Sequence, residues 1–110
     1  MKALSIRQPW AELIMRGVKA TETRSRPTNI RGRIYLYASL GRYDPACESE
    51  WAAEYGIDID SLPRGVIVGT VELCGCDGSD WQLRLPERAA ELRKPGNHPM
   101  PVWFTPFASD

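Results

Sequence analysis

The sequence has 110 residues, the size of one domain, and its 43% hydrophobic and 25% charged residues are typical of an ordinary globular protein. Its 14 basic and 14 acidic side chains balance, so no overall field argues for nucleic acid or a membrane. Nothing resembles a signal peptide or a membrane span, because the apolar runs are far shorter than the ~18 residues that a span needs. We expect one domain over residues 1–110, with no membrane partner, and favour a monomer.

The first part of the chain is predicted to form a strand, a short helix and an extended segment. Ala3–Ile6 is a short strand. The helix Pro9–Arg16 follows, because proline suits the first helical position and Gly17 ends the apolar pattern. Val18–Arg24 is expected to be extended, since its threonines favour a strand, and residues 25–32 form a turn-rich loop.

The middle of the chain is predicted to hold a strand and an acidic helix. Arg33–Ser39 alternates between apolar and polar positions, the pattern of a strand with two different faces. One face carries Ile34, Leu36 and Ala38, and the other carries Arg33, Tyr35 and Tyr37. Pro45–Tyr55 is expected to be a helix with Trp51 and Tyr55 on one stripe, followed by a loop over Ile57–Leu62.

The last part of the chain begins with the strongest strand pattern, Val66–Cys74. Residues 86–94 are predicted to form a short helix. The stretch "PMPVWFTPF" (99–107) is expected to be a strand or an extended edge, because proline excludes it from a central position. Many short strands with two or three helices indicate an α+β fold built as a small barrel or a strongly bent mixed sheet.

The three cysteines, Cys47, Cys74 and Cys76, indicate a reducing compartment, because their number is odd and the composition is not that of a disulfide scaffold. We therefore expect a cytoplasmic protein. The Cys74-x-Cys76 spacing is tighter than that of a zinc knuckle, and His98 is the single histidine. We expect neither a metal site nor a cofactor.

Charge is unevenly spread along the chain. Residues 16–33 hold six basic side chains and one acid, Glu22, a net charge of +5, whereas residues 44–60 hold six acids and no base. Whether these segments also lie apart in space depends on the fold. The basic residues are Arg16, Lys19, Arg24, Arg26, Arg31 and Arg33.

Lys19, Glu22 and Arg24 can converge only where the chain is bent, because in a regular strand Lys19 would face away from the other two. Three interpretations remain open for this group. It is a structural ion pair, or an anion-binding corner in which Glu22 orients a cation. In the third interpretation Lys19 acts as a base.

Two further sets of side chains have more than one interpretation. Arg33, Tyr35 and Tyr37 on one strand face form either a stacking platform for unpaired bases or half-buried packing. Glu72, in an otherwise apolar strand, is either a solvated outward residue or a carboxylate that lines a pocket. The catalytic residues are unknown at this point, and the candidates are Lys19, Glu22 and Glu72.

These residues also carry a resemblance to a known family. Residues 3–39 resemble the opening of the ASCH domain, the activating-signal-cointegrator homology family, and "RGVIVGTVELCGC" (64–76) resembles its second characteristic stretch. The pattern joins a strand, Gln-Pro-Trp-Ala at a helix start, Gly-x-Lys-x-x-Glu-x-Arg, and Gly-Arg before a strand. Its members here are Gln8, Pro9, Trp10, Ala11, Gly17, Lys19, Glu22, Arg24, Gly32 and Arg33, then Gly65, Gly69 and Glu72.

The resemblance implies a PUA-like β-barrel flanked by two or three short helices, with a cationic cleft between the N-terminal helix and the barrel that the Lys-x-x-Glu-x-Arg segment lines. PUA-like domains generally bind RNA, and ASCH domains are accordingly proposed to bind RNA or other nucleic acid. We therefore expect RNA or single-stranded nucleic acid as the partner. Phosphates would contact Lys19, Arg24, Arg26 and Arg33, bases would stack on Tyr35 and Tyr37, and Glu22 would serve orientation or base recognition.

The sequence departs from family members in two places. Some small relatives are amidohydrolases acting on N4-acetylcytidine, with a lysine and a threonine nucleophile three residues later. Here Glu22 takes the threonine's place, and Thr21 and Thr23 would face away in a strand. This argues against amidohydrolase activity, though not against the pocket. The chain also ends in a short proline-rich tail, so "PVWF" either stands in for a family strand or leaves the barrel partly open.

Two alternative functions stay open. Some ASCH proteins are reported as single-strand-specific ribonucleases, so a small hydrolase acting on RNA or a modified nucleoside is one alternative, with Lys19 as base and Glu22 or Glu72 as its partner. The other is a protein-interaction module of coactivator type, in which the acidic helix around Trp51 is the docking face.

Overall fold

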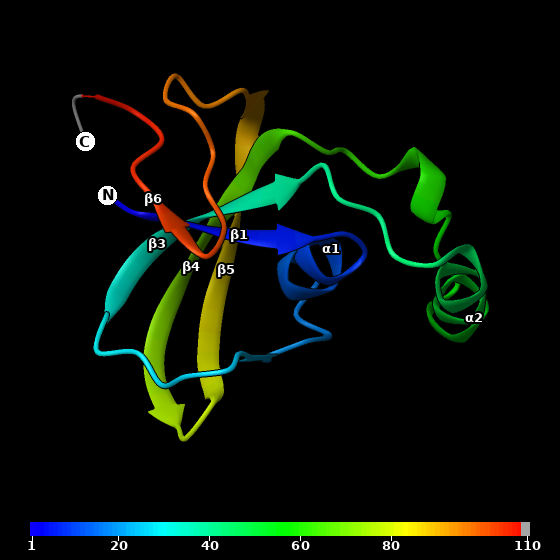
Figure 1. Ribbon diagram of the computed structural model, residues 1–110, viewed down its shortest axis with the longest axis horizontal. Helices are drawn as coiled ribbons and strands as arrows, with labels where there is room; N and C mark the ends of the chain where they lie inside the picture. The colour runs from blue at the N-terminus through cyan, green and yellow to red at the C-terminus, as the bar shows by residue number, and fades with distance from the viewer. Residues whose placement is uncertain (109–110) are drawn as a thin grey trace.

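Six strands form one sheet in the order β2-β5-β4-β3-β1-β6 in the computed structural model of the chain, which describes residues 1–108 (Figure 1). β1 pairs in parallel with β3, and every other neighbouring pair is antiparallel. The strands are β1 (Ala3–Arg7), β2 (Thr21–Thr23), β3 (Gly32–Ser39), β4 (Val66–Asp77), β5 (Asp80–Arg93) and β6 (Trp103–Phe104). The expected domain 1–110 thus ends two residues beyond the described part.

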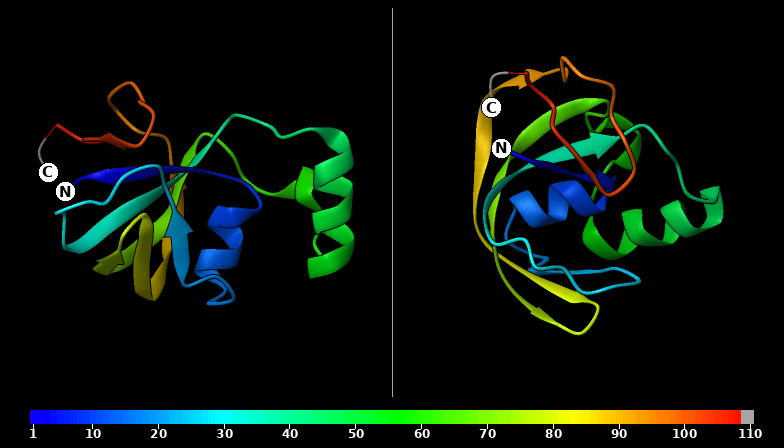
Figure 2. Two further views of the ribbon diagram at one scale, coloured as in Figure 1. Left: turned by 60° about the horizontal axis from the view of Figure 1, so that its bottom comes forward. Right: turned by 60° about the vertical axis from the view of Figure 1, so that its left-hand side comes forward.

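The sheet curls around helix α1 (Trp10–Met15), which lies in its hollow (Figure 2). Because β2 and β6 lie at opposite ends of the strand order, the sheet is a half-barrel and not a closed one. This confirms the expected α+β fold with a strongly bent mixed sheet, consistent with a PUA-like barrel. It also answers the question of the tail, because β6 in "PVWF" adds an edge strand to β1 without closing the barrel.

The alternation in β3 places its two faces as the sequence indicates. Ile34, Leu36 and Ala38 are buried in the core between α1 and the sheet. On the opposite face, Tyr37 packs with Ala3, Ile67 and Phe104, and Tyr35 packs against this second cluster. The main core also contains Leu4, Ile6, Ala11, Ile14, Met15, Val68, Val71, Leu73, Trp81 and Leu83.

Close packing of α1 on the sheet requires a glycine at position 69. A Cβ atom there would lie 2.3 Å from the backbone carbonyl oxygen of Glu87 and 2.6 Å from the sulfur of Met15. No side chain fits in that space, so β4 can meet both β5 and α1 only with glycine at this point. Gly69 therefore has a structural role in the "VIVGTVEL" pattern.

The prediction of a helix over residues 86–94 is wrong, because these residues continue strand β5. Thr70 pairs with Glu87 and Gly69 pairs with Arg88 across the β4–β5 ladder. The segment "PERAAELR" is rich in helix formers, but the unpaired edge of β4 offers it a row of backbone partners. Other limits shift as well: β4 extends past Cys74 to Asp77, and β2 is shorter than the expected Val18–Arg24.

Helix α2 (Pro45–Tyr55) and the 3-10 turn η1 (Ile59–Ser61) stand apart from the sheet (Figure 1). They are linked to the rest by a third apolar cluster, in which Leu13 of α1 meets Ile57 and Ile59. Two ion pairs also join α2 to η1, because Arg42 lies 2.5 Å from Glu48 of α2 and 2.6 Å from Asp60 of η1. The guanidinium of Arg42 lowers the pKa of Glu48 to about 2.

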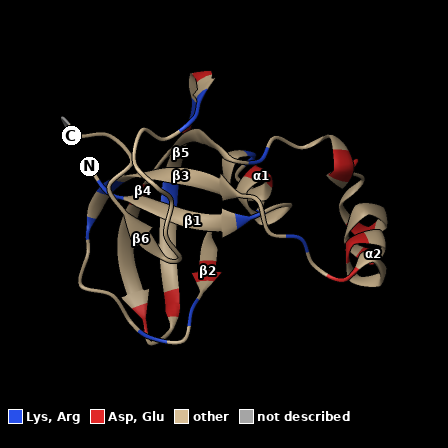
Figure 3. Cartoon of the chain, turned by 45° about the horizontal axis from the view of Figure 1, so that its top comes forward, with Lys and Arg blue, Asp and Glu red and all other residues tan. Residues whose placement is uncertain are grey.

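The uneven charge along the sequence persists in space (Figure 3). The acids of residues 44–60 gather on α2 and η1 at one end of the molecule, whereas the basic residues 24–33 follow the connection from β2 to β3. Within residues 1–108, no helix combines the length and the apolar character that crossing a membrane requires.

Candidate functional site

A cleft of about 600 Å³ opens beside β1 and β2. Its walls come from the end of β1, the start of α1, the end of β2, the segment after β3 and the segment that precedes β6. The residues that line it are Ser5, Ile6, Arg7, Trp10, Glu22, Thr23, Arg24, Tyr37, Ser39, Leu40, Gly41, Tyr43, His98, Pro99, Met100, Pro101 and Val102. Five separate segments thus meet at one concave site, a common arrangement for ligand sites.

The charged group of Lys19, Glu22 and Arg24 converges beside this cleft. Glu22 Oε2 lies 2.9 Å from Arg24 Nη2, and Glu22 Oε1 lies 3.5 Å from Lys19 Nζ. The side chain of Glu22 is 13% exposed. Glu22 and Arg24 line the cleft, whereas Lys19 stands behind Glu22 and borders a separate cavity of about 230 Å³.

The bend that the sequence requires for this convergence follows directly after α1. Gly17 has a φ of +75°, the left-handed conformation that commonly ends a helix. The next two amides, of Val18 and Lys19, both donate to the carbonyl of Leu13, and the regular strand starts only at Thr21. The Lys19 ammonium then turns back to donate to the carbonyl of Thr21 and lies 5.8 Å from the ring centre of Trp10.

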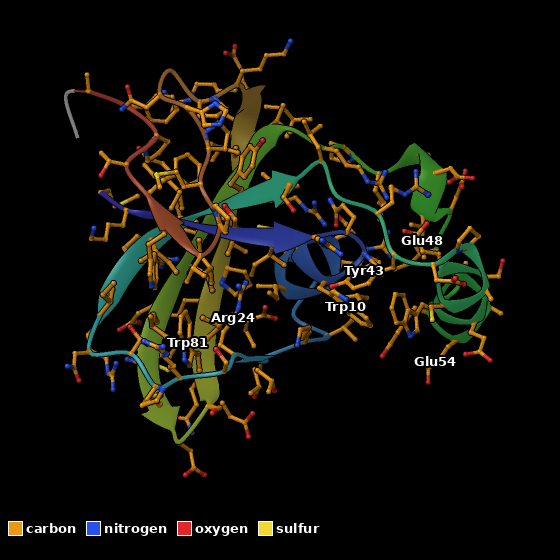
Figure 4. All side chains as sticks on the ribbon, in the orientation of Figure 1. Trp10, Arg24, Tyr43, Glu48, Glu54 and Trp81 are labelled. Atoms are coloured by element: carbon orange, nitrogen blue, oxygen red, sulfur yellow. The ribbon has the colours of Figure 1, made fainter. Side chains whose placement is uncertain are left out.

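Arg24 is held at the cleft by three kinds of contact. Its Nη2 donates to the carbonyl of Ser5 at 2.8 Å and forms an ion pair with Glu22 at 2.9 Å. Its guanidinium also lies 5.8 Å from the ring centre of Trp81 (Figure 4). The pairing of β2 with β5 sets this position, because Glu22 lies opposite Trp81 and the Arg24 amide donates to Ser79.

An aromatic wall closes the cleft on the side of α2 (Figure 4). Trp10 and Tyr43 both line the cleft, and both pack edge-on against Trp51 of α2, at centroid distances of 4.7 Å and 5.0 Å. The predicted stripe of Trp51 and Tyr55 on α2 is confirmed, because Tyr55 also packs on Trp10. Trp51 therefore supports two cleft residues from behind.

The buried Gln8 supports the aromatic wall. Its side-chain oxygen accepts from the amide of Glu12 at 2.9 Å, and its side-chain nitrogen donates to the carbonyl of Pro63 at 2.9 Å. Gln8 is fully buried. The Gln-Pro-Trp segment thus fixes the start of α1, and with it Trp10, against the chain that enters β4.

The segment His98–Val102 forms the opposite wall. Ser5 ties it down twice, through its hydroxyl to the carbonyl of Met100 at 2.7 Å and through its amide to the carbonyl of Val102 at 2.9 Å. Sequence reasoning did not include His98 in the site, because the position of a proline-rich tail follows from long-range pairing of β6 with β1.

Sequence reasoning also missed Arg7 and Tyr43. Arg7 ends β1 and its guanidinium lies 5.1 Å from the ring centre of Tyr43, and both residues line the cleft. A usable signal existed for Arg7, since it directly precedes the Gln-Pro-Trp motif at a strand end. No local pattern marks Tyr43, which reaches the cleft through the turn that follows β3.

Four of the predicted nucleic-acid residues have other surroundings. Tyr37 lines the cleft, but it is only 4% exposed and packs edge-on against Phe104. Burial raises its pKa. Tyr35 packs against Phe107 outside the cleft lining. Arg33 donates to the carbonyl of Leu85 at 2.6 Å, and Arg26 is exposed, with its carbonyl accepting from Trp81.

The catalytic candidate Glu72 lies outside the cleft. It accepts two bonds from Arg84, at 2.9 and 3.1 Å, and this guanidinium lowers the pKa of the Glu72 carboxyl. Thr23 lines the cleft instead of facing away, and its hydroxyl donates to Asp80 at 2.7 Å. In residues 1–108, no three His, Cys, Asp or Glu side chains are grouped as a metal ion would require.

A curled sheet holding a helix in its hollow, with the Lys-x-x-Glu-x-Arg segment at a cleft, defines the class of this chain. A family model for the ASCH domain matches residues 4–97, and the chain belongs to the ASCH domain family. Among its relatives, activating signal cointegrator 1 of Homo sapiens is 39% identical over 100 residues, and that of Mus musculus is 36% identical over 96 residues.

These alignments cover 84% and 80% of this chain but only 17% and 16% of the two relatives. The chain thus spans about a sixth of the length of the curated relatives it matches. The similarity concerns this domain, and the activities of the longer proteins do not follow from it.

Proposed function

We propose that the cleft binds single-stranded nucleic acid, RNA in particular. One observation carries the proposal: Arg7 and Arg24 line the same concave site as the rings of Trp10 and Tyr43. Guanidinium groups bind phosphate oxygens in pairs of hydrogen bonds, and aromatic rings stack on unpaired bases. The ASCH family is generally linked to RNA binding, which supports the same conclusion.

The local charge of the cleft favours an anionic ligand even though the whole chain is neutral. Two arginines line it against one acid, Glu22, and Lys19 stands directly behind that acid. The acids of α2 do not line the cleft, and Glu48 forms an ion pair with Arg42. A phosphate at the cleft thus meets more positive than negative charge at short range.

A single strand fits the cleft better than a duplex does. A volume of about 600 Å³ lies in the range of small-ligand sites. The walls formed by Tyr43 and by the segment His98–Val102 would admit an unstacked nucleotide, whose base faces are free. In this proposal Arg7 and Arg24 contact phosphate, whereas Lys19 contributes only through its electrostatic field.

The basic residues outside the cleft extend the proposed path. Arg26 is exposed directly after Arg24, and Arg33 follows at the start of β3. A strand that leaves the cleft on this side would meet these cations, and on the other side it would meet the acids of α2. We therefore propose that flanking phosphates follow the β2–β3 connection.

The two other functions have weaker support. A hydrolase would need Lys19 beside the substrate, but Lys19 lies behind Glu22 and outside the cleft lining. A docking face around Trp51 would need a free ring, but this ring packs on Trp10 and Tyr43. The relatives are named signal cointegrators, and a protein partner is a separate outcome of binding experiments.

The test is fluorescence anisotropy of a labelled single-stranded RNA with the wild type, Arg7→Gln and Arg24→Gln. Each change removes one cleft charge and is expected to weaken binding about three- to tenfold at moderate salt. Arg84→Gln is the matched control, because Arg84 is paired with Glu72 as Arg24 is with Glu22, but outside the cleft. Equal losses in all three variants would contradict the cleft assignment.

The same samples are to be run on a denaturing gel after incubation. Intact RNA is the expected result. Shortened RNA that accumulates with time would replace the binding proposal with the ribonuclease alternative. Thermal melting of each variant separates a loss of binding from a loss of folding, which matters for Arg24 because it also holds the carbonyl of Ser5.

A further inference from the structure

Glu22 is the one carboxylate among the described residues that line the cleft. We infer that it accepts a hydrogen bond from the exocyclic amino group of a bound base, so that the cleft prefers adenine, cytosine or guanine over uracil. This inference rests on the proposed function of the cleft and assigns the chemical class of nucleotide that it takes.

A carboxylate in a phosphate-binding cleft needs an explanation, because it repels the phosphate and weakens the field of the arginine beside it. Orientation of Arg24 does not require this charge. The carbonyl of Ser5 accepts from the same Nη2 atom at 2.8 Å, and Trp81 lies against the guanidinium. A second role for Glu22, toward the ligand, accounts for a negative charge at this point.

The contacts of Glu22 within the protein leave part of its hydrogen-bonding capacity unused. Its Oε2 forms an ion pair with Arg24 Nη2 at 2.9 Å, but its Oε1 is 3.5 Å from Lys19 Nζ, beyond the usual N–H···O range. The Lys19 ammonium instead donates to the carbonyl of Thr21. Each carboxylate oxygen accepts up to two bonds, so the Glu22 carboxylate, which lines the cleft, retains the capacity to accept from a ligand there.

The four bases differ in what they offer to such an acceptor. Adenine, cytosine and guanine each carry an exocyclic amino group, whereas the corresponding groups of uracil are carbonyl oxygens. A carbonyl oxygen facing the Glu22 carboxylate would place two acceptors together and leave both unsatisfied. Uracil has one ring donor, its N3–H, but this lies between two carbonyl oxygens that a carboxylate repels, so the carboxylate favours a base with an amino group.

The mouth of the cleft suits the flat faces of a base. Three apolar side chains that line it are well exposed: Leu40 at 69%, Met100 at 57% and Val102 at 38%. They stand on two different walls, Leu40 after β3 and the others on the segment before β6. Covering such side chains with a base removes apolar surface from water, while the amino edge reaches the polar interior.

The first experiment measures the binding of five-nucleotide RNAs of sequence UUXUU to the wild type by competition anisotropy. With adenosine, cytidine or guanosine at X, we expect binding about three- to tenfold tighter than with uridine, the effect of one hydrogen bond to a charged acceptor. Purine riboside at X, which is adenosine without its amino group, should bind like uridine. Equal affinity for all five RNAs would overturn the inference.

The second experiment repeats the series with Glu22→Gln, which keeps the shape but supplies both a donor and an acceptor. The preference for amino-bearing bases should fall below about twofold, while affinity for the uridine RNA is retained or rises because a repulsive charge is gone. The control is Glu50→Gln, an exposed acid on α2 outside the cleft, which should keep the wild-type preference. A preference that survives in Glu22→Gln would overturn the assignment to Glu22.

The two proposals fail in different ways. If all RNAs bind with salt-dependent affinity but without regard to X, the nucleic-acid function stands and the base preference is overturned. If none of the RNAs binds to the wild type at low salt, the proposed function itself is overturned. The wild-type series decides this without any variant, so a variant that folds poorly does not affect it.

Discussion

At the scale of single residues, the carboxylate of Glu12 forms an ionic contact outside the cleft that connects two elements. Its side chain is 9% exposed and accepts bonds from Arg88 at 2.7 and 3.0 Å and from Arg16 at 2.6 Å. The hydrogen bonds from Arg88 are the main reason why the pKa of Glu12 lies below its ordinary value of 4.5. This contact ties α1 to β5.

The lowered pKa predicts a specific pH dependence of stability. Because the folded carboxyl binds its proton less readily than the unfolded one, its contribution is fully present above about pH 4.5 and is lost as the pH falls through the lower folded pKa. Glu12→Gln should lower the free energy of unfolding by about 1 to 2 kcal/mol at pH 7, since the half-exposed Arg88 and Arg16 lose the charged acceptor that they share.

Chemical denaturation at pH 7 and at pH 3 measures this difference. The penalty of Glu12→Gln should be smaller at pH 3, below the ordinary pKa of 4.5, because part of the stabilisation by the ionised carboxyl is lost there. Glu50→Gln on the exposed side of α2 provides the control and should match the wild type at both values. An equal penalty at both pH values would show that the charge of Glu12 does not matter.

The residue scale also shows what a short motif can and cannot predict. The sequence required a bend if Lys19, Glu22 and Arg24 were to meet, and the bend lies between Gly17 and Thr21 as expected. It left open which of the three faces a ligand. That depends on the pairing of β2 with β5, a contact between residues almost 60 positions apart.

At the scale of elements, the secondary-structure prediction succeeded for α2 and failed for part of β5. Helix α2 has the limits that the sequence predicted. Asp44 caps it, Pro45 begins it and Gly56 ends it, so its ends are fixed by local residues. The helix predicted over residues 86–94 is wrong, because the local preference of "PERAAELR" is helical but its strand form depends on pairing with β4. Long-range strand pairing of this kind produces no recognisable pattern in the sequence of the segment itself.

Helix α2 has a predicted effect on the cleft through Trp51. Trp51→Ala removes the ring that supports Trp10 and Tyr43, so we expect a loss of stability of about 2 to 4 kcal/mol. At a temperature where the variant is folded, RNA binding should also weaken, since two lining residues lose their support. Trp51→Phe, which keeps an aromatic ring, should recover most of both properties.

Thermal melting and anisotropy measured on the same samples test this link. Tyr55→Ala provides the comparison, because Tyr55 also packs on Trp10 but has no ring contact with Tyr43 in the described part of the chain. It should affect binding less than Trp51→Ala does. Unchanged RNA affinity in a folded Trp51→Ala protein would separate α2 from the cleft.

At the scale of the whole molecule, a neutral chain carries the acids of residues 44–60 on α2 and η1 at one end and a basic segment along the β2–β3 connection (Figure 3). The sequence predicted the two charged segments and the class of fold, because both follow from local composition and motif. It did not predict Arg7, Tyr43 or His98 at the cleft, since three separate chain segments bring them there. Composition therefore indicates which charges exist, and only the fold shows which of them meet.

The central claim, that cleft cations hold phosphates, is tested most directly by the salt dependence of RNA affinity. The logarithm of the affinity of wild type should fall linearly with the logarithm of salt concentration. In the double variant Arg7→Gln/Arg24→Gln the slope should be shallower by about 1.4, which corresponds to two phosphate contacts on a single strand at about 0.7 each. Parallel lines for the two proteins would contradict the account.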